Sequence, residues 1–196
     1  QSTGSVDFQT PANDVYNNGS TVNTTITAAT GGNFEQLTPN PAPATTVIAD
    51  SVDTTTATLT ATPSVTEGGV ITYTVTLSNT AQTPVTVTLS NGQTITVAAG
   101  QSTGSVDFQT PANDVYNNGS TVSTTITSTT GGNFEQLDVS STPAVTSITD
   151  SIDISTVTLT ATPSVTEGGT VVYTATVSAP VTGAPLVITL ANGQTI

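Results

Sequence analysis

The chain repeats itself at a spacing of 100 residues. The segment Gln1–Val22 returns letter for letter as Gln101–Val122, and Thr58–Gly69 returns as Thr158–Gly169. Self-similarity at a fixed period is the signature of a repeat architecture. A period of about 100 residues is longer than a helical-solenoid unit or a propeller blade, but it suffices for a β-sandwich with its own core. The sequence therefore predicts a tandem array of domains.

Alternating side chains predict the fold class. In Val70–Ser78, large apolar residues alternate with threonine, a pattern typical of a strand with one buried face. Strands of this kind are expected near residues 56–66, 70–78, 84–90, 93–98, 103–110, 120–129 and 142–150. Gly, Asn and Pro between them mark turns, and no segment has helical periodicity. We predict an all-β fold, an immunoglobulin-like antiparallel β-sandwich in a tandem repeat of about 100 residues.

The sequence Asp-Ser-x-Asp marks the expected linkers. It occurs at Asp50–Asp53 and Asp150–Asp153, each time just before the repeated TLTATPSVTEGG block. Residues 54–153 are then a complete repeat, residues 1–53 the C-terminal half of another, and residues 154–196 an N-terminal half. Half a sandwich leaves an apolar face and strand edges uncovered. The expected partners are neighbouring repeats of the same chain, in a window on a longer polypeptide, or complementary half-domains of adjacent molecules.

Composition narrows the possible functions. The chain has 13 acidic residues, a net charge of −13 and no Lys, Arg, His or Cys. Nothing in it neutralises phosphates, so we expect no nucleic-acid partner. Nucleophile–base sites that need His, Cys or Lys are excluded, and a two-carboxylate glycosidase would normally add aromatic platforms and a large cleft. We therefore predict no enzyme. No apolar run is long enough to span a bilayer, so we expect no direct membrane insertion.

Sandwich topology predicts where the acidic residues meet. Loops that share one pole, together with the following linker, gather acids that are far apart in sequence, and the next repeat adds acids from its own loop. Singly, each acid is an ordinary solvated surface group, but clustered carboxylates without cations must repel or bind a metal. Oxygen donors without His or Cys favour Ca²⁺ over Zn²⁺, and flexible geometry favours it over Mg²⁺. The candidate ligands are Asp7, Asp14, Asp50, Asp53, Glu67, Asp107, Asp114, Glu135, Asp138, Asp150 and Asp153.

Two tyrosines recur at one place in the repeat. Tyr16 and Tyr116 stand just before an expected strand. A tyrosine at such a corner often hydrogen-bonds to the backbone through its hydroxyl group. We expect a structural role of this kind for both.

Several segments together carry a family resemblance. They are ATLTATPSVTEGG, VTVTLSNGQTITVAAGQSTGSVDFQTPANDVY and GGNFEQL. They resemble the Ig-like extender repeats of giant bacterial RTX adhesins, similar to those of a marine ice-binding adhesin, over essentially the whole chain. The resemblance implies an extracellular protein on the bacterial cell surface that takes part in adhesion and biofilms. It also implies repeats that are rigidified by Ca²⁺ and project a ligand-binding tip.

Three functions remain open at this point. The first is a structural spacer stiffened by calcium at the junctions between domains. The second is a carbohydrate- or cell-binding module that is itself the adhesive unit. The third is a surface or contact module that assembles laterally. Near-identity between repeats favours the spacer, because a recognition surface does not need many copies in series.

Overall fold

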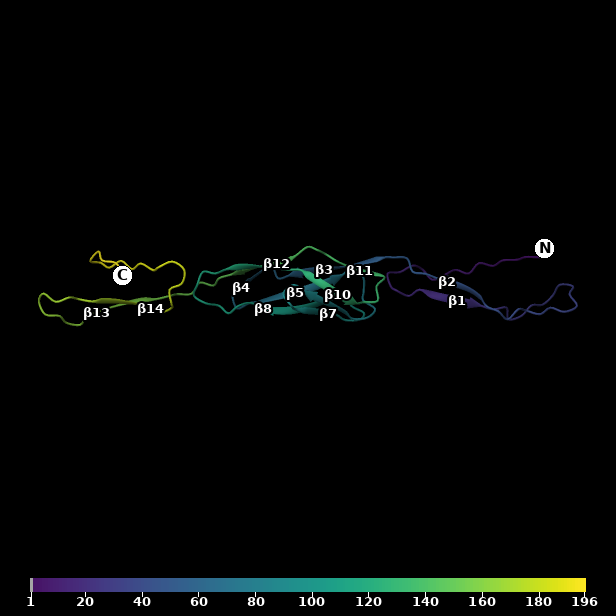
Figure 1. The fold of residues 1–196 in the computed structure, drawn as a ribbon, viewed down its shortest axis with the longest axis horizontal. Coiled ribbons are helices and arrows are strands. Elements are labelled where there is room, and N and C mark those ends of the chain that lie inside the picture. The colour runs from purple at the N-terminus through teal and green to yellow at the C-terminus, as the bar shows by residue number, and fades with distance from the viewer. Residues whose placement is uncertain (1) are drawn as a thin grey trace. The chain divides into compact units, whose positions relative to one another are not determined.

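The regular elements of the chain are β-strands. The computed structural model describes residues 2–196, and no helix occurs among them (Figure 1). Accordingly, these residues contain no helix long and apolar enough to cross a membrane. The chain divides into two compact units, each defined by residues that contact one another more than they contact the rest of the chain. The first holds the residues up to Pro63, Ile71–Phe108 and Val122–Thr146, and the second holds Ser64–Val70, Gln109–Thr121 and Ser147–Ile196.

Three sheets are built from residues 54–149. One has the order β11-β3-β5-β8, from strands Gln136–Val139, Thr54–Ala61, Val70–Leu77 and Thr103–Gln109. Another has the order β10-β6-β7, from Ile126–Gly131, Val85–Leu89 and Thr94–Val97. The third has the order β4-β12-β9, from Ser64–Thr66, Ala144–Thr149 and Ser120–Thr124. The all-β sandwich predicted from the alternation is confirmed.

The core lies on the faces that the alternation predicted. On β5, Ile71, Tyr73 and Val75 are fully buried, whereas Thr72 and Thr76 between and beside them are exposed. Burying such side chains is the main favourable term in folding, at about 25 cal/mol per Å² of apolar surface. β6 and β7, which belong to another sheet, contribute the buried side chains of Val85, Val87, Leu89, Ile95 and Val97 to the core.

One polar contact is buried within this core. The hydroxyl group of Tyr73 lies 2.9 Å from Oγ1 of Thr124 on β9, and both residues have no exposed surface. The Tyr73 ring also meets Phe108 of β8 edge to face, with ring centroids 6.5 Å apart. Since a buried hydroxyl group without a partner is costly, this hydrogen bond is what allows a tyrosine at the centre of the repeat.

Two strand pairs are parallel where antiparallel pairing was expected. β11 pairs with β3, and β12 pairs with β4, both in parallel. The strand expected over residues 56–66 is divided because Pro63 cannot donate a ladder hydrogen bond. Residues before Pro63 pair with β5, and residues after it pair with β12. The strand expected over 120–129 is likewise divided, at Thr125, into β9 and β10, and the pairing of β10 with β6 has a register shift between Ile126 and Ser128.

The segments at the two ends of the chain keep their local pairing. In the first unit, β1 (Ser20–Thr24) pairs with β2 (Ala44–Ile48). In the second, β13 (Val157–Ala161) pairs with β14 (Tyr173–Val177), in the register that β3 and β5 adopt 100 residues earlier. Residues 3–9, however, form no strand, although their identical counterparts form β8. The difference follows from the neighbour, because β8 pairs with β5 and residues 3–9 have no such strand beside them in sequence order.

Candidate metal centre at the acidic junctions

The first junction is organised by two aspartates that hold a loop. Oδ2 of Asp50 accepts hydrogen bonds from the backbone amides of Asn18 and Gly19, at 3.0 and 2.9 Å. A Cβ atom on Gly19 would lie 3.3 Å from that oxygen, so a glycine suits this close approach. Asp14 accepts from the Tyr16 amide at 2.8 Å and from the Asn18 side chain at 2.9 Å. The carboxylates of Asp14 and Asp50 therefore fix the conformation of the loop over residues 14–19.

The linker itself is tied to the repeat that follows it. The backbone amide of Asp53 donates to Oε2 of Glu135 at 2.7 Å. The carboxylate of Asp53 accepts from Nδ2 of Asn13 at 2.6 Å and from Oγ of Ser51 at 3.1 Å. Residues 82 positions apart thus meet at one place, as the topology argument predicted.

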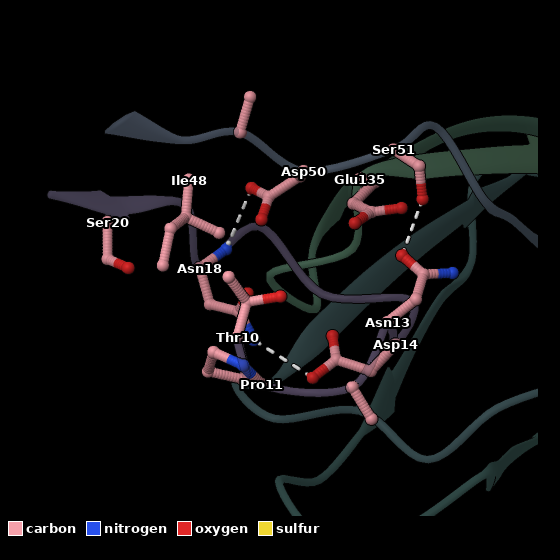
Figure 2. Close-up of a pocket in the computed structure, with 12 residues that line it drawn as sticks. Thr10, Pro11, Asn13, Asp14, Asn18, Ser20, Ile48, Asp50, Ser51 and Glu135 are labelled. Carbon is pink, nitrogen blue, oxygen red and sulfur yellow. Dashed lines mark hydrogen bonds between the residues drawn. The ribbon is translucent and has the colours of Figure 1, made fainter. Parts of the chain in front are cut away.

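Asp14, Asp50 and Glu135 line one pocket. Its volume is about 290 Å³, and the amide and hydroxyl groups of Asn13 and Ser51 also line it. Figure 2 shows the three carboxylates arranged around this space. The oxygen atoms available here are those that Ca²⁺ prefers.

A short β-bridge joins the same two segments. The amide of Asn17 donates to the carbonyl of Asn133 at 3.0 Å, and the amide of Glu135 donates to the carbonyl of Val15 at 3.0 Å. Asn133 adopts a left-handed backbone conformation, with φ of 59°, which asparagine tolerates better than most residues. The bridge therefore fixes the backbone of Glu135 at the junction by protein contacts alone.

The side chain of Tyr16 contacts the following repeat. Its ring stacks on Phe134, with centroids 5.8 Å apart and planes at 22°. Its hydroxyl group donates to the carbonyl of Thr80 at 2.7 Å. In the second unit, Tyr116 makes the equivalent bond to the carbonyl of Pro180 at 2.8 Å. The expected bond to backbone exists, but it spans 64 residues in each case because the tyrosine lies at the junction.

The second junction, in the second unit, repeats the arrangement of the first. Asn113 donates to Oδ2 of Asp153 at 2.7 Å, and Ser151 donates to the same oxygen at 2.8 Å and to Oδ1 of Asn113. The amide of Asn118 donates to Asp150 at 3.3 Å, and its side chain donates to Asp114 at 3.1 Å. The same set of side chains therefore recurs at both linkers.

The hydrogen bonds to Asp153 predict a shifted titration. Those from the Asn113 side chain, and then from Ser151, lower the pKa of Asp153 below its ordinary value of 3.8. A depressed folded-state pKa gives stability that is present above the unfolded value and is lost as pH falls through the folded one. We expect the Asp153 carboxyl signal in an NMR titration to have its midpoint below 3.8, and the Asn113→Ala variant to raise it. Equal midpoints in the variant and in an Asn117→Ala control would contradict this.

Glu67 stands beside the second linker with an unpaired oxygen. The parallel β4–β12 pairing aligns Thr66 with Thr149, and the Glu67 amide donates to the Thr149 carbonyl at 3.0 Å. Glu67 and Asp150 each directly follow the last paired residue of their strand. Gly68 follows with φ of +72°, a conformation that favours glycine, and its amide donates to the carbonyl of Pro111 at 2.7 Å. Oε2 of Glu67 is buried and has no hydrogen-bond partner among the described residues.

Of the remaining candidates, Asp107 and Asp138 lie on strands and Asp7 lies outside any strand. Asp107 on β8 accepts a hydrogen bond from Thr72 at 2.7 Å, and Asp138 on β11 accepts one from Gln136 at 2.9 Å. Asp7 is exposed, and none of these three lines the pocket at the first junction. Across residues 2–196, no group of three or more carboxylates is arranged to hold a metal ion. An ion at a junction would therefore also need amide or carbonyl oxygens.

Sequence reasoning missed the polar and aromatic partners of the acids. Asn13, Ser51 and Phe134 hold the first junction together and were not predicted. Asn13 and Ser51 could have been predicted from the sequence, because each is adjacent to a junction acid and recurs unchanged 100 residues later.

Nearly the whole chain is similar to a known protein family. A family model described as LapA domain matches residues 1–51, 53–151 and 153–196. The matched segments meet within the two Asp-Ser-x-Asp sequences. No curated protein matches the chain.

Proposed function

Since the chain belongs to the LapA domain family of bacterial adhesin modules, we propose that it is a structural spacer whose junctions are rigidified by calcium. The family makes it part of a surface-associated or secreted protein. We take residues 54–153 as one repeat of this spacer and assign it no catalytic role. The observation that carries the calcium proposal is the buried, unpartnered Oε2 of Glu67 beside the linker.

The donor set at the junctions suits calcium. All candidate ligands offer oxygen, and the sequence has no His or Cys that would favour zinc. A carboxylate oxygen that is buried without a partner carries a desolvation cost that a bound cation would offset. At the second junction we propose ligands drawn from Glu67, Asp114, Asp150 and Asp153, completed by amide or carbonyl oxygens. At the first junction we propose Asp14, Asp50, Asp53 and Glu135, and Asp7, Asp107 and Asp138 stay predictions.

Calcium would add to contacts that already exist without it. The β-bridge and the Tyr16–Phe134 stack hold the first junction through uncharged groups. The chain has a net charge of −13 and no side-chain cation, so the acids at a junction repel one another unless a metal neutralises them. A bound ion of this kind removes the repulsion and fixes the linker.

Calcium removal tests the proposal directly. We expect small-angle scattering of the 1–196 chain in calcium to indicate a stiffer chain than in chelator, and calorimetry to give a Kd of about 10⁻⁴–10⁻³ M. At 100 times that Kd, binding would stabilise the chain by about 2.7 kcal/mol, seen as a higher Tm. Magnesium at the same concentration is the control cation. If neither the scattering profile nor the Tm differs between calcium and chelator, calcium binding is contradicted.

A double variant separates the junction from the repeat. Replacing Asp150→Asn and Asp153→Asn together should weaken calcium binding and leave the strands of residues 54–149 folded, as judged by circular dichroism. Loss of the fold itself would mean that these acids stabilise the sandwich and not the junction.

A further inference from the structure

Four Asn-Gly sequences occur in the chain, and they fall into two structural classes. Asn91–Gly92 and Asn192–Gly193 lie in tight turns, whereas Asn18–Gly19 and Asn118–Gly119 lie in the loops beside the two linkers. An asparagine followed by glycine can react with its own backbone, because glycine has no side chain to hinder the approach of its amide nitrogen to Cγ of the asparagine. The hydrogen bonds around each pair therefore decide which of the four can react.

The two asparagines in tight turns are held away from this reaction. The Gly92 amide donates to the carbonyl of Leu89 at 3.0 Å, and Oδ1 of Asn91 accepts from the Gln93 amide at 3.0 Å. Nδ2 of Asn91, the nitrogen that would have to leave, is buried. The turn over residues 190–194 has both of these hydrogen bonds as well. Both turns therefore occupy the groups that would have to react.

The asparagine beside the first linker lies between two carboxylates. Oδ2 of Asp50 accepts from the Gly19 amide at 2.9 Å, so the hydrogen on the attacking nitrogen points at a group within the reach of a general base. Nδ2 of Asn18 donates to Oδ2 of Asp14 at 2.9 Å (Figure 2). One carboxylate thus contacts the attacking group, and the other contacts the leaving group.

The loop beside the second linker has the same arrangement. Nδ2 of Asn118 donates to Asp114 at 3.1 Å, and the backbone amide of Asn118 donates to Asp150 at 3.3 Å. A Cβ atom on Gly119 would lie 3.4 Å from Oδ2 of Asp150, so this carboxylate lies beside the glycine, as its counterpart does in the first loop. Asn18 and Asn118 are both exposed. Water therefore reaches both copies.

We propose that Asn18 and Asn118 modify themselves to aspartate and isoaspartate. The nitrogen of Gly19 forms a bond to Cγ of Asn18. The proton that it loses passes through Asp50 to the side-chain nitrogen, which leaves as ammonia. The cyclic imide that results takes up a water molecule and opens at either of its carbonyl groups, which gives aspartate or isoaspartate. Asp150 has the role of Asp50 at the second copy, and water is the only other reactant.

The modification changes both the charge and the backbone of the loop. Either product replaces a hydrogen-bond donor to Asp14 by a carboxylate, so the acids of the junction repel one another more strongly. Isoaspartate also routes the main chain through the side chain, which lengthens the loop by a carbon atom just before β1. The two copies lie 100 residues apart, so the site recurs once per repeat.

Timed incubation of the 1–196 chain tests the proposal. Chelator is present throughout, so that no metal occupies the carboxylates. Peptide mapping by mass spectrometry should show aspartate and isoaspartate accumulating at residues 18 and 118, with Asn91 at least tenfold slower in the same molecules. Asp50→Asn should slow the conversion of Asn18 about tenfold or more and leave that of Asn118 unchanged. Asp150→Asn should do the reverse, so each loop is the control for the other.

The direction of the change separates proton transfer from a purely structural role. If Asp50 does no more than hold the loop, its removal frees Asn18 and the conversion becomes faster, which would overturn the proposal. Circular dichroism confirms that each variant keeps its strands. Equal rates at Asn18 and Asn91, or asparagine that stays intact at both linker loops, would overturn it as well.

Discussion

Replacing Glu67→Gln is expected to stabilise the chain in chelator and to destabilise it relative to the unsubstituted chain in calcium. Oε2 of Glu67 is buried without a hydrogen-bond partner, and a neutral amide costs less to bury than a carboxylate. We expect a gain of about 1 kcal/mol in chelator, at the lower end of the cost of an unsatisfied buried group. In calcium, loss of a charged ligand should lower the affinity about tenfold or more, because affinity follows the ligand charge count.

The chain supplies a matched control for this substitution. Glu167 stands in the same Thr-Glu-Gly-Gly sequence, but it is exposed, and residues 164–166 form no strand. Glu167→Gln should change neither the Tm in chelator nor the calcium affinity. Calorimetric melting and calcium titration of the two variants side by side measure both quantities. If Glu67→Gln destabilises the chain in chelator, Glu67 is a structural residue and the calcium proposal loses its main support.

The second large effect is expected at the centre of the repeat. Tyr73 is fully buried, packs against Phe108 and shares a hydrogen bond with Thr124. Truncating a buried aromatic side chain to alanine costs about 3–5 kcal/mol. Domains of this size have a total stability of about 5–15 kcal/mol. Tyr73→Ala should therefore remove a large part of the stability of residues 54–153.

Two control substitutions test whether the stability lost in Tyr73→Ala comes from packing of the buried ring. Tyr73→Phe keeps the ring and loses only the hydroxyl contact, so it should cost about 0.5–1.5 kcal/mol. Tyr173→Ala makes the same chemical change at a side chain that is 39% exposed and should leave the main unfolding transition unchanged. Urea unfolding followed by circular dichroism compares the three variants. Equal midpoints for Tyr73→Ala and Tyr73→Phe would show that the ring does not hold the core.

The alternation of side chains was sufficient to predict most of the strands and the buried face of β5, but not which strands pair. On β5, each expected inward residue is buried. The parallel partners of β3 and β4 depend on the point where the chain crosses from one sheet to the next. That point is set by a single residue, Pro63. The short strand β11 was missed because its four residues, Gln136–Val139, include a charge and give too little alternation to recognise.

The structure brings together the acids of the first linker and of the loops beside it. Asp14, Asp50, Asp53 and Glu135 meet as topology suggested. Asp107 lies on the strand expected over residues 103–110, whereas Asp138 lies on β11, where no strand was expected; both accept hydrogen bonds from residues in the same sheet or strand. For Tyr16, the sequence predicted a hydroxyl bond to the backbone but not that the acceptor lies in the next repeat. That acceptor, the carbonyl of Thr80, is brought close by contacts between repeats.

The β-bridge between Val15–Asn17 and Asn133–Glu135 has a consequence for how an array of such repeats unfolds. When one repeat loses its structure, its neighbour loses a pair of backbone hydrogen bonds and a stacked ring as well. The free energy of an array is then a sum of repeat terms and nearest-neighbour terms, as in other repeat proteins. An interior repeat gains from two neighbours and a terminal one from a single neighbour. Melting therefore starts at the ends, and cooperativity grows with the number of repeats.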